Sequence, residues 1–550
     1  MCNKLYGIMS ISLVLVIILF AFCDIHFATN DDTVMVDIAS GGYGTPLPYL
    51  SNIHIILGWV YVWLFTHVLG VNWITISYIL TYYISFCAIG YAIDLRLNNG
   101  IKLVVFSVFV IASASYFTFT IVAFVAAIAG IMLYDSSLDD SAGNGKVKMV
   151  ALLIVTLAVL FRAEVIKGVL ILYSVSIIHS FMYHKEKLKP QIVLAVLCVI
   201  LMNVGIQSNI FIVEKNLIAR EHLAWGEIRS EALDCAKVEY NEKTFSDIGL
   251  SFEQYWAMYN AFYYDKSQLQ ITDFKKLISL NKNENKYNFK LGKIYQDFKN
   301  DYIRTIGWSN IPLIICLCLI VTCFINSDDK MMAFFLFIIL CLYVTLFYVI
   351  QRPLYRVIMP GVMYVSFMCV KNIKICITKG NIICWVIIAL FVSFRLISYD
   401  LIPKTVYSDK KNMVLDYIVA NNGCIYMAGD VEVFSVGRAR SIYDYTAKHG
   451  FWNIMGNWEI YGPPYKVLMN IYKLDESRGL LMSSLDSNKV LIITTQGDMF
   501  PEKGHMIISW LKKYYNIDAK FEMVDIIDGT NNDIGENWMV YKIITEKDRE

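Results

Sequence analysis

Apolar runs separated by short polar connections fill the first 400 positions of the chain. Most of these runs approach the roughly 20 residues that an α-helix needs to cross a bilayer. We predict spans at about 5–23, 73–94, 101–115, 117–134, 147–161, 165–183, 191–208, 306–326, 331–349, 354–370 and 381–398. The pattern indicates a polytopic α-helical membrane protein with about eleven transmembrane helices.

The pattern changes after about residue 399, where short β-branched and aromatic segments alternate with helical ones, as in an α/β domain. We expect strands at 423–429, 489–495, 521–527 and 538–544, and helices at 412–421 and 505–515. The chain is therefore predicted to contain a transmembrane domain at 1–398 and a small α/β domain at 399–550.

The apolar segment 52–70 decides the predicted topology. It is nearly long enough to span, but it carries His54 and His67 among aromatic residues. If it lies flat on the outer surface as an interfacial helix, nearly every lysine cluster of the connections falls on the inner side. If it spans, the clusters move outside, against the positive-inside rule. We therefore predict a cytoplasmic N-terminus, outer loops at 24–72 and 209–305, and an extracytoplasmic C-terminal domain.

Composition agrees with a membrane protein. The chain is 57% hydrophobic and only 17% charged, whereas soluble domains carry roughly 25% charge. A net charge of +1 argues against a nucleic-acid partner. The 13 cysteines lie mostly in apolar runs without metal-ligand spacing, so no metal site or cofactor is indicated, and a divalent-metal requirement stays open. High usage of Lys, Asn, Ile and Tyr indicates a low-GC bacterium, and hence its plasma membrane.

Two adjacent carboxylates, Asp31 and Asp32, follow the first apolar run directly. One interpretation is structural: Thr29 or Asn30 caps a short helix, both aspartates occupy its first turn, and Gly41 ends it. The other is chemical, because carboxylates beside a bilayer are costly unless they lie in a wet cavity or take part in a reaction. Two such groups could supply a general base and a group that binds a hydroxyl or a cation.

Charged residues recur where other apolar runs meet the predicted outer face. Arg162 and Glu164 lie between two spans, and Arg352 and Arg356 flank a short turn. They could anchor the helices at the interface. Arginines on the outer face also oppose the positive-inside trend, which a bound phosphate or an anionic lipid headgroup would explain.

The layout resembles the GT-C superfamily of integral-membrane glycosyltransferases. The similarity lies in a first helix, an outer loop with the acidic pair Asn30-Asp31-Asp32, the Gly/Pro stretch Tyr43-Gly-Thr-Pro-Leu-Pro48, and a juxtamembrane segment ending in Leu69-Gly70. The Phe161-Arg162 hinge and the turn Arg352-Pro-Leu-Tyr-Arg356 resemble a sub-group of bacterial cell-envelope members. The pair is Asp-Asp rather than Asp-Glu, and no His-Pro-Pro follows.

The resemblance implies an inverting transfer of a sugar from a polyprenyl-phosphate donor to a glycan or lipid acceptor of the cell envelope. Asp31 or Asp32 would be the catalytic base. The predicted donor-phosphate site comprises Arg162, Arg352 and Arg356, and the predicted substrate-binding set comprises Glu164, Tyr43 and His54. Membrane lipids are the other expected partner. Two alternatives remain, a polysaccharide or glycolipid transporter and a non-catalytic envelope assembly protein.

Overall fold

A computed structural model gives the architecture of most of the chain. It describes residues 2–23, 25–97, 99–139, 145–234, 238–285, 291–300, 311–326, 329–350, 352–372, 414, 416–428, 441–448, 450, 453–456, 459–495, 500–527 and 537–545.

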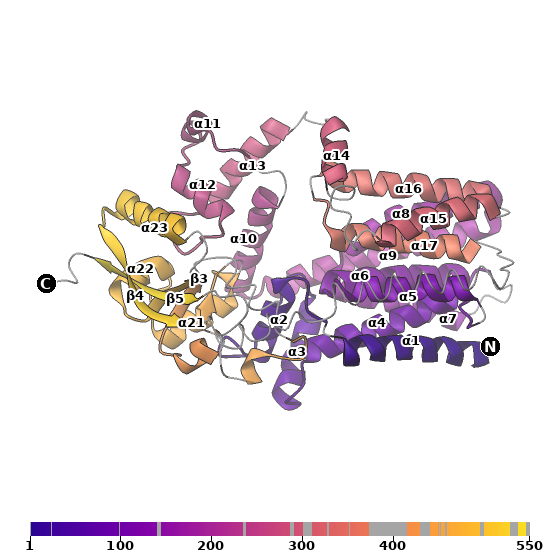
Figure 1. The fold of residues 1–550 in the computed structure, drawn as a ribbon, viewed down its shortest axis with the longest axis horizontal. Helices are drawn as coiled ribbons and strands as arrows, with labels where there is room; N and C mark the ends of the chain where they lie inside the picture. Colours follow the sequence, from indigo (N-terminus) through magenta and orange to yellow (C-terminus); the bar gives the residue numbers. More distant parts are fainter. Residues whose placement is uncertain are drawn as a thin grey trace.

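Long apolar helices lie side by side in a bundle (Figure 1). The bundle comprises α1 (Cys2–Phe22), α4 (Trp73–Ala92), α5 (Gly100–Ala114), α6 (Phe119–Ser136), α7 (Gly145–Arg162), α8 (Val165–Tyr183), α9 (Lys185–Val213), α15 (Ile311–Asn326), α16 (Lys330–Val349) and α17 (Tyr355–Asn372). Within the described chain, six of them (α1, α4, α6, α8, α9 and α16) are long and apolar enough to cross a membrane. Ten predicted spans thus coincide with helices, and the eleventh, 381–398, lies outside the described residues.

Helix α9 continues to Val213, five residues beyond the predicted end of its span at 208. The extension is held by the first outer loop: the backbone N–H of Ile55 donates to Asn209 Oδ1 at 2.8 Å, and His54 Nε2 lies 2.9 Å from Ser208 Oγ.

Helix α6 is the centre of the bundle, packed against α4, α7 and α8 and buried almost throughout. Its small residues permit close approach of neighbouring backbones. A Cβ added at Gly130 would lie 2.7 Å from the carbonyl oxygen of Ala151 on α7. Helix α6 is therefore packed closely against α7 in its C-terminal half.

Two short helices, α2 (Asn30–Ser40) and α3 (Ile55–His67), lie between α1 and α4. Helix α3 has 13 residues, fewer than a perpendicular span needs. Trp59 and Trp63 are exposed on α3, whereas Tyr61 is buried. This half-exposed apolar helix suits the predicted interfacial position.

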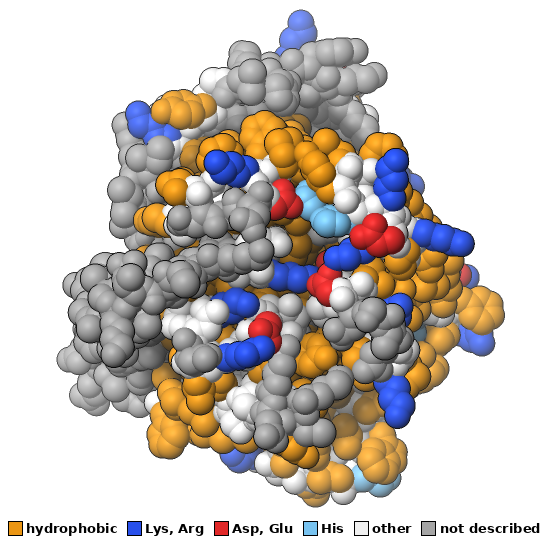
Figure 2. Space-filling model, turned by 90° about the vertical axis from the view of Figure 1, so that its right-hand side faces the viewer, with side chains coloured by type: hydrophobic (Ala, Val, Ile, Leu, Met, Phe, Trp, Pro, Cys, Tyr) orange, Lys and Arg blue, Asp and Glu red, His pale blue; other side chains and the backbone are white. Residues whose placement is uncertain are grey.

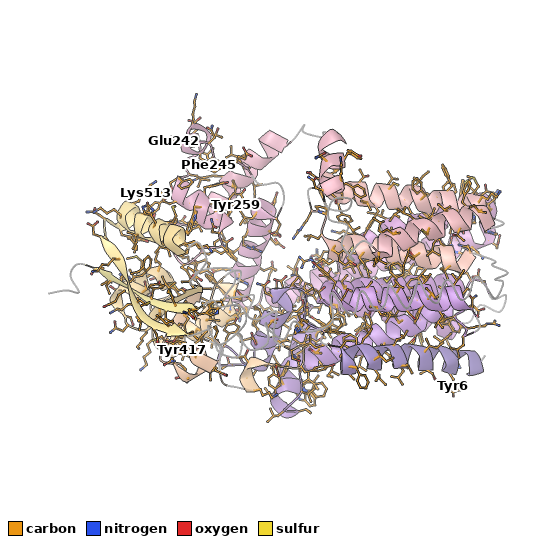
Figure 3. All side chains as sticks on the ribbon, viewed as in Figure 1. Tyr6, Glu242, Phe245, Tyr259, Tyr417 and Lys513 are labelled. Atoms are coloured by element: carbon orange, nitrogen blue, oxygen red, sulfur yellow. The ribbon has the colours of Figure 1, made fainter. Side chains whose placement is uncertain are left out.

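The predicted long outer loop is helical where it is described. It contains α10 (Leu217–Leu233), α11 (Glu242–Asp247), α12 (Phe252–Tyr259), α13 (Ile271–Asn285) and α14 (Leu291–Phe298). Figure 3 shows Glu242, Phe245 and Tyr259 on the same side of the molecule as Lys513 of the C-terminal domain, with Tyr6 of α1 at the opposite end.

The C-terminal domain is a five-stranded mixed sheet with helices, as the sequence predicts in outline. Strands β1 (Ile425–Ala428), β2 (Ile454–Met455), β3 (Val490–Thr495), β4 (Ala519–Ile527) and β5 (Trp538–Thr545) have the order β2-β1-β3-β5-β4, accompanied by α21 (Pro463–Tyr472), α22 (Gly479–Asp486) and α23 (Phe500–Tyr515). Strand β1 pairs in parallel with β2 and β3, and β5 pairs antiparallel with β3 and β4. Four strands were predicted; the two-residue β2, α21 and α22 were not. The predicted helix at 412–421 lies partly outside the described residues.

The C-terminal domain is fastened to the first outer loop. Asn72 Nδ2 donates to the carbonyls of Ile442 and Asp444, at 2.9 and 3.1 Å. Thr446 donates to the buried carboxylate of Asp37 on α2. These contacts join the α/β domain to the same end of the bundle at which α2 lies (Figure 1).

The other end of the bundle carries the basic connections. The N-terminus of α1 lies there, far from the α/β domain (Figure 1). Figure 2 shows this end, with Lys and Arg side chains gathered around Asp and Glu in the middle of the face. Lys187 of α9 pairs with Asp139, and so does Lys371 of α17 at 3.1 Å. The bundle thus separates these lysines from Asp31, as the predicted topology requires.

Candidate functional site

The acidic pair occupies the first turn of α2. Thr29 is the N-cap residue with extended backbone angles (φ −131°, ψ 151°), and Gly41 ends the helix in the left-handed region (φ 87°). The predicted bounds of the helix are therefore confirmed, although the Thr29 side chain accepts no backbone N–H and instead donates to Asp32. The first turn of a helix favours carboxylates because its backbone N–H groups have no partner within the helix and carry a partial positive charge. Adjacent positions on a helix point in different directions, so Asp31 and Asp32 have different surroundings.

Asp32 points into the protein and is fully buried. Its carboxylate accepts hydrogen bonds from the backbone N–H of Phe119 at 2.8 Å, from Thr29 Oγ1 at 2.8 Å and from the Tyr78 hydroxyl at 3.2 Å. Burial raises the pKa of Asp32 to about 7, although the hydrogen bonds from Phe119 and Thr29 oppose this. Asp32 thereby ties the start of α2 to the start of α6.

Asp31 points instead into a cavity of about 690 Å³. Its side chain is 27% exposed, and one carboxylate oxygen lies 3.9 Å from Nη1 of Arg356 on α17. That separation is at the outer limit of an ion pair and beyond hydrogen-bond distance. Asp31 therefore keeps access to a ligand in the cavity, whereas Asp32 does not line its wall.

Arg162, at the end of α7, lines the same cavity. Its Nη1 donates to Thr120 Oγ1 at 2.6 Å, and its guanidinium lies 5.2 Å from the centre of the Phe119 ring. Its Nε lies 4.0 Å from Glu164, another residue of the wall. The start of α6 thus positions both Asp32 and Arg162.

The predicted arginine turn completes this side of the cavity. Arg352 Nη2 donates to Oδ2 of Asp234, the residue just after the end of α10, at 2.8 Å. Arg356 lies 3.9 Å from Asp31. The structure therefore brings Asp31 together with all three arginines of the predicted phosphate site, although the four residues are spread over more than 300 positions of the sequence.

The predicted substrate-binding residues occupy different places. Glu164 lines the cavity with a side chain that is 54% exposed. His54 also lines it, but its ring is the N-cap of α3: Nδ1 accepts the N–H of Ile56 at 3.2 Å. Burial lowers the pKa of His54. Tyr43 is 2% exposed and is not part of this wall.

Sequence reasoning missed a further part of the cavity wall. It comes from α10, through His222, Glu227 and Arg229, and from Pro463 at the start of α21. A signal was present on α10, where His222 and Arg229 are seven residues apart and so lie on one helical face. Nothing in the local sequence connected Pro463 with this helix.

The site combines a carboxylate with several guanidinium groups beside apolar helices. Guanidinium groups bind phosphate oxygens through two parallel N–H donors, and a nearby carboxylate can accept a proton from a hydroxyl. Over the described ranges, no group of three or more His, Cys, Asp or Glu side chains is arranged to hold a metal ion.

Comparison with family models, with curated proteins and with solved structures finds no match to this chain.

Proposed function

We propose that this protein is an inverting membrane glycosyltransferase that uses a polyprenyl-phosphate-linked sugar, with Asp31 as the general base. The observation that carries the proposal is the convergence of Asp31 with Arg162, Arg352 and Arg356 on one cavity beside the apolar bundle. A donor with a polyprenyl tail would keep the tail in the bilayer and present its phosphate at the membrane surface. The cavity has charges suited to that phosphate.

The proposed reaction is a single displacement at the anomeric carbon. Asp31 takes the proton of the acceptor hydroxyl while the hydroxyl oxygen attacks the anomeric carbon. The bond from the anomeric carbon to the phosphate oxygen breaks at the same time. The phosphate leaves with an additional negative charge, which the guanidinium groups stabilise. Arg356 is suited to this role because its contact with Asp31 is long, at 3.9 Å, so it can turn to a phosphate.

Asp32 has a positioning role in this proposal. Its three hydrogen bonds fix the first turn of α2 on α6, and so set the direction of Asp31. Reacting groups need a defined separation and orientation, and small displacements reduce the rate strongly.

The proposed location is the outer face of a bacterial plasma membrane, with about eleven spans and the α/β domain outside. This topology places the lysine-rich end of the bundle in the cytoplasm, in keeping with the positive-inside rule. The cavity then opens on the outer side, where a cell-envelope acceptor is available.

The test is the glycan profile of a strain in which Asp31→Asn replaces the native residue. We expect the product glycan to fall at least 100-fold at equal protein level, the range for loss of a general base. The matched control is Asp94→Asn, an exposed carboxylate that pairs with Arg96 at the other end of the bundle. An unchanged profile in Asp31→Asn would refute the proposal. If the chain instead moved a labelled glycolipid across proteoliposomes without any acceptor, a transporter would be indicated.

A further inference from the structure

The cavity has a second polar wall, on α10, that takes no part in the reaction proposed above. His222 and Arg229 line it, and between them Trp225 is buried. The Trp225 ring stacks on His222 with centroids 5.8 Å apart, and the Arg229 guanidinium lies 5.8 Å from its centre. Trp225 therefore holds both polar side chains in place.

A turn of the C-terminal domain closes this wall. A Cβ added at Gly462 would lie 3.1 Å from ring atoms of His222, so the turn and the imidazole are in direct contact. The imidazole also hydrogen-bonds to the backbone of Ile460, and the next residue after Gly462, Pro463, lines the cavity. The α/β domain is thus part of the cavity rather than a separate appendage.

Glu459, at the start of this turn, is buried next to the wall but does not line the cavity. It is 2% exposed, and neither of its carboxyl oxygens accepts a hydrogen bond from another residue of the described chain. Nε of Arg229 also lacks a hydrogen-bond partner within the described residues. Buried polar atoms without partners cost roughly 1–3 kcal/mol each, and such groups often have a ligand-binding or catalytic role.

The charge state of the wall follows from its surroundings. Burial, with the negative charges of Asp31 and Asp37 nearby, raises the pKa of Glu459 well above its usual range. Burial and Arg229 lower the pKa of His222 to about 4. At neutral pH the wall therefore offers the neutral imidazole of His222 and the cation of Arg229, and so contains both donors and an acceptor.

We propose that His222 and Arg229 form the acceptor subsite and that the acceptor is a hydroxyl-rich carbohydrate. This inference rests on the proposed transferase function and gives its acceptor a chemical class. Sugar hydroxyls both donate and accept hydrogen bonds, which matches a wall of mixed donors and acceptors. An acceptor chain bound here shares one cavity with Asp31, because His222, Arg229 and Asp31 all line it.

His222 and Arg229 are seven positions apart, or about 10 Å along the axis of α10. The phosphate of the donor is assigned to Arg162, Arg352 and Arg356 of the same cavity, so the two ligands use different side chains.

The test measures two ligands separately on the full chain in lipid nanodiscs. Neutral di- and trisaccharides are screened by saturation-transfer NMR, and undecaprenyl phosphate binding is titrated by tryptophan fluorescence. We expect Arg229→Gln to weaken saccharide binding at least fivefold and to leave undecaprenyl phosphate binding within twofold. Arg220→Gln, an exposed arginine on the same helix that does not line the cavity, is the matched control.

Three results would overturn the inference: no saccharide binds the wild type, Arg229→Gln binds saccharide normally, or it loses undecaprenyl phosphate binding to the same extent. His222→Gln, with thermal unfolding as a check of folding, provides a further variant of the same wall. Failure of the transferase proposal has a different signature, because it appears as an unchanged glycan profile in Asp31→Asn even if saccharides bind to α10.

Discussion

The two ends of the helical bundle use charged residues in opposite ways. At the lysine-rich end, Asp135 accepts hydrogen bonds from Gln191 at 2.7 Å and from Tyr173 at 3.3 Å, and Lys371 lies 3.6 Å from it. Asp139 is paired with both Lys187 and Lys371. At the cavity end, the contacts of Arg356 with Asp31 and of Arg162 with Glu164 are 3.9 and 4.0 Å long.

This difference concerns the charges that line the cavity. The network at the lysine-rich end joins α6, α8, α9 and α17, although Oε1 of Gln191 has no hydrogen-bond partner among the described residues. At the cavity end, Arg352 keeps a 2.8 Å contact with Asp234, whereas Arg356 and Arg162 have only long contacts with carboxylates and Nε of Arg229 has no hydrogen-bond partner in the described chain. We infer that mutations at the first end mainly affect stability, and that those lining the cavity mainly affect ligand binding.

The largest expected effect concerns Asp32, a buried carboxyl whose three hydrogen bonds all come from neutral groups. Its pKa is about 7 in the folded protein and near 3.8 when unfolded. Between these values the folded state keeps a proton that the unfolded state releases, so stability falls as the pH rises from 4 to 7. Asp32→Asn should remove this slope, worth up to about 4 kcal/mol at 1.36 kcal/mol per pKa unit.

The measurement for Asp32 is thermal unfolding of the detergent-solubilised chain at several pH values, with the variant compared to the wild type at each one. Asp94→Asn, at an exposed position, should keep the wild-type slope. Identical pH profiles for Asp32→Asn and the wild type would show that Asp32 ionises normally in the folded protein.

The next largest loss of stability is expected when a cation is removed from the lysine-rich end. Lys371→Met leaves Asp135 and Asp139 without one of their cations in a partly buried place, and should cost about 2 kcal/mol of unfolding free energy. Arg356→Met, the matched change at the cavity end, should cost less than about 1 kcal/mol because its ion pair is long. Equal losses in chemical denaturation would contradict the distinction between the two ends.

The same two variants should reverse their order when binding is measured. Arg356→Met should weaken the binding of undecaprenyl phosphate about tenfold, since one charge-assisted contact to a phosphate contributes about 1.5 kcal/mol. Lys371→Met should leave the dissociation constant unchanged within twofold. A loss of binding in Lys371→Met at a temperature where it is folded would show that the two ends are coupled.

The smallest expected effect concerns the attachment of the α/β domain. Asn72→Ala removes the donor to the carbonyls of Ile442 and Asp444 and should cost about 1 kcal/mol. Because the domain closes the α10 wall through residues 459–463, saccharide binding should fall about twofold while undecaprenyl phosphate binding stays unchanged. If phosphate binding fell instead, the domain would support the arginine wall rather than the α10 wall.

Local patterns were sufficient to predict much of the fold and part of the site. The apolar runs predicted ten of the described bundle helices, and Thr29 and Gly41 marked the two ends of α2 as expected. The end of α9 could not be predicted, because it is held by His54 and Ile55 of another segment. The two-residue strand β2 exists only by pairing with β1, so it has no signal of its own.

The sequence by itself determined that the chain is built from apolar helices, that an acidic pair follows the first of them, and that arginines lie at the same predicted face. These properties depend on neighbouring residues and on helical periodicity, which can be read locally. Only the tertiary structure separated the roles of the two aspartates, because burial of Asp32 depends on Tyr78 and Phe119, far away in sequence. The meeting of α10 with the turn at Glu459 was likewise decided by long-range packing.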